Sequence, residues 1–127
     1  MINLELCQEM FDRVDRIAQL FRDKKLDNPQ LVNEVLQELN GIYDYLNPLY
    51  LQAIVEEELY KAEQYIYHKE NKEEKNTDTT AKKKADLEAE EYSKIRAKLE
   101  GYIKNIMTNI TSCQSLIKTF EIQSNIK

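Results

Sequence analysis

The chain has 127 residues, with only two Gly and two Pro, and a net charge of −5. This length supports one domain. So few Gly argue against a β-sandwich, a Gly-rich phosphate loop and a dinucleotide-binding turn, because these need backbone positions free to adopt positive φ. With 32% charged and 42% hydrophobic residues, the composition is typical of exposed helices around a modest apolar core.

The charge is distributed unevenly along the chain. Residues 1–50 and residues 51–80 each carry −4, whereas residues 81–127 carry +3. Such asymmetry is typical of a surface for nucleic acid or for a protein partner, and a solvated Lys-rich helix is the alternative.

The first 68 residues predict three helices. Apolar residues at spacings of three and four indicate a helix over 3–25. Asn28 as N-cap and Pro29 in the first turn predict the start of a second helix. Asn47-Pro48 repeats this signal, so we expect a third helix from Pro48 to near His68. The expected core-facing residues are Cys7, Phe11, Val14, Ala18 and Phe21; Val32, Val35, Leu36, Leu39 and Ile42; and Leu51, Val55, Leu59, Ala62 and Ile66.

Residues 69–80 contain no apolar side chain, so we expect a mobile polar connection. Thr79 or Thr80 is positioned to cap a helix over about 81–124, which would be about 65 Å long. Its apolar residues recur at heptad spacing and predict a seam that packs against a partner helix, from this chain or from another copy. The seam residues are Tyr92, Ile95, Leu99, Tyr102, Ile106, Asn109, Cys113, Leu116 and Phe120.

Asn109 is the polar residue within this seam. It either fixes the register of a homo-oligomer or lies at a frayed edge. The predicted fold is therefore all-α: one helical domain over 1–127 and a bundle of about four helices. It comprises a helical part over 1–68, the connection, and a long coiled-coil-like helix over 81–127.

No catalytic constellation is visible. His68 is the only histidine and is expected to be exposed, and neither cysteine has a His partner in the sequence pattern. The run of carboxylates at 56–58 is best interpreted as a solvated face, because adjacent helical residues do not face one another. We expect no enzyme activity, metal, cofactor or small-molecule substrate.

The expected location is the cytoplasm, or the host cytoplasm if the protein is viral. The first residues lack the pattern of a signal peptide, and no apolar run approaches the roughly 18 residues of a membrane span. Cys7 and Cys113 belong to no Cys-x-x-Cys motif, so they are expected to be core thiols in a reducing compartment.

Tyrosines interleaved with basic residues before the connection, and the cations after it, are candidates for binding single-stranded nucleic acid. The alternative is that the tyrosines are half-buried in the core and the cations pair with neighbouring carboxylates. The candidate residues are Lys61, Tyr65, Tyr67, Lys82, Lys83, Lys84, Lys94, Arg96, Lys98 and Lys104.

The second half of the chain resembles a family of small phage proteins. The segment 59–65 leads through a polar break to Thr80-Ala81-Lys82-Lys83-Lys84-Ala85 and then to a long helix ending in Gln114-Ser115-Leu116-Ile117-Lys118. This order is similar to that of the UvsY-like recombination mediators over about the last 65 residues. In that family a basic pair in the helix before the break contributes to DNA binding. Lys61 matches its first member, whereas Glu63 lies near the second.

The resemblance implies a ring-like homo-oligomer that binds single-stranded DNA, contacts the single-strand-binding protein and helps to load a recombinase. The predicted function is therefore that of a non-enzymatic phage recombination mediator. The alternative is an acidic helical adaptor or inhibitor that binds a host or viral protein.

Overall fold

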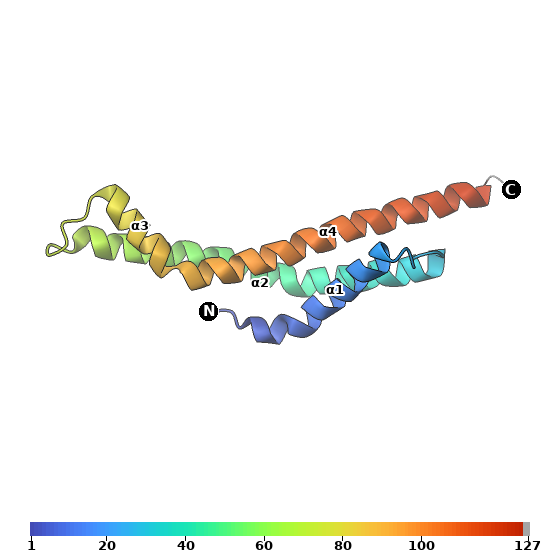
Figure 1. Ribbon diagram of the computed structural model, residues 1–127, viewed down its shortest axis with the longest axis horizontal. Coiled ribbons are helices and arrows are strands. Elements are labelled where there is room, and N and C mark those ends of the chain that lie inside the picture. The colour runs from blue at the N-terminus through green and yellow to red at the C-terminus, as the bar shows by residue number, and fades with distance from the viewer. Residues whose placement is uncertain (126–127) are drawn as a thin grey trace. The chain divides into compact units, whose positions relative to one another are not determined.

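The computed structural model describes residues 1–125, which contain helices and no strand (Figure 1). The predicted all-α fold with a long C-terminal helix is confirmed. A short 3-10 helix, η1, precedes four α-helices. The bounds are η1 Leu4–Cys7, α1 Gln8–Arg22, α2 Pro29–Glu70, α3 Asp78–Glu88 and α4 Glu90–Asn125.

The chain divides into two compact units. The first unit contains residues 1–2 and Leu49–Leu99, and the second contains residues 3–48 together with the chain from Glu100 onward. The C-terminal part of α2, α3 and the start of α4 therefore form most of the first unit. The second unit is built from α1, the N-terminal part of α2 and most of α4.

The two Asn-Pro signals behave differently. Asn28 Oδ1 accepts a hydrogen bond from the Leu31 amide at 2.9 Å, and α2 begins at Pro29 as expected. The predicted break at Pro48 is wrong, because α2 continues through this residue. Pro48 donates no backbone hydrogen bond and costs the helix roughly 3 kcal/mol. Burial of Leu46 before it and Ala53 after it offsets this cost.

The core-facing side of α2 beyond Pro48 is also not the predicted one. Buried residues of α2 recur at heptad spacing from Leu39 through Leu46 to Ala53, and half-buried Tyr60 continues the series. Because the helix is uninterrupted, this spacing determines which face points inward beyond Pro48. The predicted core face is instead exposed, and it comprises Leu51, Val55, Leu59, Ala62 and Ile66.

The second unit has a core of small and medium apolar side chains from α1, α2 and α4. The Phe11 ring stacks on Tyr102 with centroids 4.2 Å apart, and the Tyr102 hydroxyl donates to Asp15 at 3.0 Å. Burial and this bond raise the pKa of Tyr102 to about 12. The predicted stripe in α1 is partly confirmed, because Ala18 and Phe21 are only half-buried. The buried residues are Cys7, Phe11, Val14, Ile17, Leu26, Val32, Val35, Leu39, Ile42, Leu46, Ile103, Ile106 and Cys113.

The predicted helix over 81–124 is divided at Ala89 into α3 and α4. Ala89 is fully buried, and Ala81 and Ala85 before it are also buried. Small side chains allow a close approach of packed backbones, and the heptad pattern does not specify the division at Ala89. The cap is also displaced, because Thr77 Oγ1 accepts from the Thr80 amide at 3.2 Å.

Candidate functional site

The C-terminal part of α2 exposes a continuous row of apolar side chains, which we name the α2 stripe: Leu51, Val55, Leu59, Ala62 and Ile66. The exposed fractions are 54% for Leu51 and Val55, 58% for Leu59 and 52% for Ile66. Successive members are three or four residues apart, so they lie on one side of the helix. The opposite side carries the buried residues Ala53, Glu57 and His68. This part of α2 therefore has an apolar face directed to solvent as well as a face directed to the core.

Carboxylates flank the α2 stripe. At 100° per residue, Glu58 lies along one edge, and Glu63 and Glu70 lie along the other. All three side chains are exposed. Within residues 1–125 none of the three forms a side-chain hydrogen bond or an ion pair. The charge at both edges is therefore negative and is not neutralised by other side chains of the described residues.

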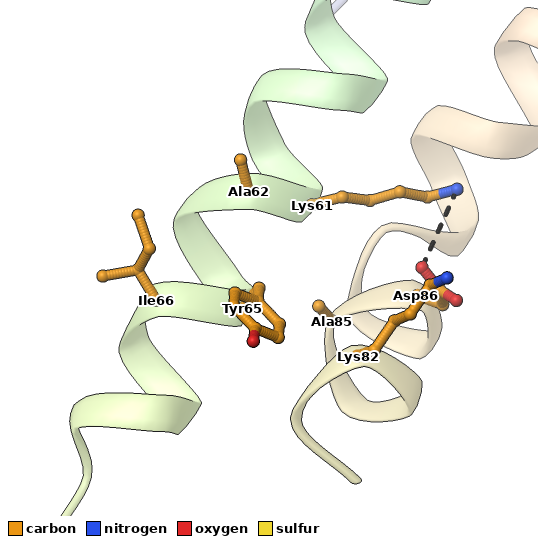
Figure 2. A pocket seen from close by; sticks show the side chains of 7 residues that line it. All are labelled: Lys61, Ala62, Tyr65, Ile66, Lys82, Ala85 and Asp86. Atoms are coloured by element: carbon orange, nitrogen blue, oxygen red, sulfur yellow. Dashed lines mark ion pairs between the residues drawn. The ribbon is translucent and has the colours of Figure 1, made fainter. Parts of the chain in front are cut away.

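A groove of about 370 Å³ continues the apolar surface between α2 and α3 (Figure 2). Ala62 and Ile66 belong to both the stripe and the groove. Tyr65 points from α2 toward α3, and Lys61 extends across to Asp86, with Nζ 3.9 Å from the carboxylate (Figure 2). The lining residues are Lys61, Ala62, Tyr65, Ile66, Lys82, Ala85 and Asp86.

Behind the stripe, a buried carboxylate holds α2 against the start of α4. Glu57 is 6% exposed and accepts hydrogen bonds from Lys61 Nζ at 2.9 Å and from Arg96 Nε at 2.6 Å. Burial by itself would raise the pKa of Glu57, but these two cations lower it overall. Tyr60 stacks on Tyr92 beside this group, with ring centroids 4.6 Å apart. These contacts hold the stripe-bearing part of α2 against the start of α4.

The loop over 71–77 is fastened to α2 by a network around His68, which is 5% exposed, so the expectation of an exposed histidine is wrong. Nδ1 of His68 lies 3.0 Å from Glu74, and Nε2 lies 2.6 Å from Glu88. Asn76 Nδ2 donates to the backbone oxygen of His68 at 3.0 Å, and Lys84 Nζ lies 3.3 Å from Glu74.

This network perturbs both of its principal titrating groups. Hydrogen bonds to Glu74 and Glu88 raise the pKa of His68. Hydrogen bonds from Asn76, His68 and Lys84 lower the pKa of Glu74 to about 2. Sequence reasoning missed this cluster, because its members are brought together only by the return of the chain at the loop.

Most of the residues predicted to bind nucleic acid have interaction partners within the chain. Nine of the ten lie in the first unit, and Lys104 lies in the second. Most of their polar groups already have partners. The Tyr65 hydroxyl donates a hydrogen bond to Asp78, and Lys98 also interacts with another group. The side chains of Tyr67, Lys82 and Lys83 are exposed. The ion pairs are Lys61 with Glu57 and Asp86, Lys84 with Glu74, Lys94 with Glu90, Arg96 with Glu57, and Lys104 with Glu100.

The predicted oligomer seam is largely occupied within one chain. Leu99, Ile106 and Cys113 are buried without a second copy. Tyr92 stacks on Tyr60, Tyr102 stacks on Phe11, and Asn109 donates to Asn105 Oδ1 at 2.7 Å. The remaining seam residues are half-buried: Ile95, Leu116 and Phe120.

In the described residues 1–125, no group of three or more His, Cys, Asp or Glu side chains is arranged to hold a metal ion. Burial raises the pKa of both free thiols, Cys7 and Cys113. None of the helices over these residues is long and apolar enough to cross a membrane.

Comparisons with family models, with curated proteins and with solved structures found no match to this chain. The geometry of the α2 stripe and its surroundings therefore carries the functional argument.

Proposed function

We propose that this protein is a non-enzymatic helical adaptor that binds a protein partner through the α2 stripe. The single observation that carries the proposal is the exposure of four large aliphatic side chains in one row on α2. Contiguous apolar surface on a folded chain is typical of an interaction site, whereas isolated exposed apolar residues are ordinary.

The row can contribute a sizeable part of the free energy of an interface. Each large side chain of the stripe is about half exposed, and full burial of such a side chain contributes about 1.5–3 kcal/mol. Covering the remaining exposed half of all four therefore contributes roughly 3–6 kcal/mol before the costs of association. Charged rims around an apolar centre are the usual anatomy of such an interface.

The experiment compares capture of partners by the native chain and by two double variants in a lysate of the source cells. Val55→Ser with Leu59→Ser removes the centre of the α2 stripe. Leu87→Ser with Met107→Ser changes two other exposed apolar residues, at 72% and 53% exposure, and is the matched control. We expect a stoichiometric protein partner that is lost with the stripe variant and retained with the control. Equal capture by all three proteins would refute the proposal.

Single-stranded DNA binding, as part of an oligomeric mediator that loads a recombinase or contacts a single-strand-binding protein, is the second candidate. The observation that favours it is the exposure of Lys82 and Lys83 on α3, where neither lysine has an ion-pair partner in the described residues. A filter-binding titration with labelled single-stranded DNA at low and moderate salt tests it. If the lysines bind phosphates, the affinity for single-stranded DNA should fall steeply as the salt concentration rises. Absence of binding at low salt would exclude this candidate.

A further inference from the structure

We infer that the partner segment of the α2 stripe is an amphipathic helix whose apolar face is bordered by basic side chains. The inference rests on the proposed function and deepens it, since it specifies the chemistry of the partner. Two independent features lead to it: the straightness and length of the stripe, and the charge along its edges.

The stripe has the shape of a helix-binding surface. Its members follow spacings of four, four, three and four residues, so four turns correspond to fifteen residues. This period of about 3.75 residues is close to the 3.6 of an α-helix, so the row follows the helix axis and winds by only about 60° around it over its length. From Leu51 to Ile66 it extends about 23 Å at 1.5 Å per residue. A straight helix of about four turns covers such a row with residues at matching spacing.

The carboxylates along the edges of the α2 stripe determine which charge the partner helix should carry. Glu58, Glu63 and Glu70 are exposed carboxylates without a cation partner among the described residues. The lysines of the same segment are already engaged: Lys61 with Glu57 at 2.9 Å and Lys69 with Asp78 at 2.8 Å. A partner with Lys or Arg beside its apolar face would neutralise the free carboxylates, and an acidic partner would be repelled.

The same edges disfavour two other occupants. A second copy that paired its own α2 stripe with this one would bring the same unneutralised carboxylates to the interface, and α2 offers no unpaired lysine in return. A phosphate backbone would meet these carboxylates as a like charge. Lys82 and Lys83, which have no ion pair among the described residues, lie on α3 and not on the helix that carries the carboxylate rim.

The test uses three labelled peptides of 18 residues with one Leu face spaced as in the stripe and with Lys, Gln or Glu at the flanking positions. Fluorescence anisotropy measures their binding to the full chain at low and moderate salt. We expect the Lys peptide to bind about tenfold more tightly than the Gln peptide, an advantage that decreases as salt rises. The Glu peptide should bind least.

Two charge variants locate the effect. Glu58→Gln with Glu63→Gln and Glu70→Gln should remove most of the preference for the Lys peptide over the Gln peptide. The control, Glu5→Gln with Glu9→Gln and Glu121→Gln, makes the same change in net charge at exposed residues of the second unit and should retain the preference.

The outcomes separate this inference from the proposed function. The basic-helix inference would be overturned if the Lys and Gln peptides bound equally, or if both charge variants lost the preference for the Lys peptide to the same extent. In that case, stripe-dependent capture of a partner would still support the adaptor function. Failure of every peptide to bind would overturn the inference too. Light scattering that detected a dimer dissociated by Val55→Ser with Leu59→Ser would identify a second copy as the occupant and likewise overturn it.

Discussion

Replacing one leucine on each face of α2 tests the assignment of the two faces directly. Leu46 is 0% exposed and lies in the core of the second unit, whereas Leu59 is 58% exposed in the α2 stripe. The substitutions Leu46→Ala and Leu59→Ala remove the same atoms from the same helix. Ala is also at least as favourable as Leu within a helix, so intrinsic helix propensity cancels in the comparison.

The two substitutions differ in the apolar surface and packing that they remove. Leu46→Ala leaves a cavity in a close-packed core and should cost about 2–5 kcal/mol of unfolding free energy. Leu59→Ala removes a side chain that keeps most of its surface in water, and should change the unfolding free energy by about 0.5 kcal/mol or less. For a chain of this length, each kcal/mol corresponds to a change in Tm of roughly 3–6 °C.

The assay is urea and thermal unfolding followed by circular dichroism at 222 nm, for the native chain and both variants under one set of conditions. We expect the Tm of Leu46→Ala to fall by roughly 6–30 °C and that of Leu59→Ala to stay near the native value. Equal losses of Tm in the two variants, or a larger loss for Leu59→Ala, would mean that the stripe is a core face. That result would refute both the assignment of the buried and exposed faces of α2 and the proposed adaptor function.

Three further predictions concern buried polar groups and thiols. The pKa of His68 is raised in the folded chain, so its contribution to stability should be complete below the unfolded pKa of about 6.5 and be lost as pH rises through the folded value. His68→Gln should therefore flatten the dependence of Tm on pH above about 6.5, and a native Tm that rises across this range would contradict the network. Glu57→Gln leaves two cations facing a neutral amide and should cost about 1–3 kcal/mol in urea unfolding; an unchanged midpoint would exclude a structural role for this carboxylate. The thiols of Cys7 and Cys113 are buried with raised pKa, so a thiol reagent such as dithionitrobenzoate should react slowly with the native chain and rapidly in urea, and fast reaction of the native chain would refute their burial.

Local signals predicted much of the helical structure correctly. The scarcity of Gly and the apolar periodicity predicted an all-α chain, and Asn28 caps α2 as its position before Pro29 indicates. The heptad residues Leu99, Ile106 and Cys113 are all buried. These features depend on contacts within a few residues or on a repeat that persists over many turns, and both are present in the sequence itself.

The failed predictions share a tertiary cause. Pro48 predicts a break because a local penalty of roughly 3 kcal/mol usually ends a helix. Packing before and after Pro48 keeps the helix continuous. Ala53, seven residues after the buried Leu46, therefore lies on the same buried side of α2. Continuing the heptad spacing through Pro48 was the signal that could have placed Leu59 on the outer face. For His68, no signal within the sequence joins it to Glu88, which is 20 residues away.

The sequence by itself determined the helical class, the start of α2, the apolar rows and the excess of acid before the polar connection. Only the tertiary structure decided that the face with Ala53, Glu57 and His68 is buried beyond Pro48 while the more apolar face is exposed, since burial depends on what the rest of the chain presents to the helix. The same folding paired Lys61, Lys84 and Arg96 with carboxylates and left Glu58, Glu63 and Glu70 without such partners in the described residues. Charge totals along a sequence do not contain that distribution, because an ion pair depends on distance in space.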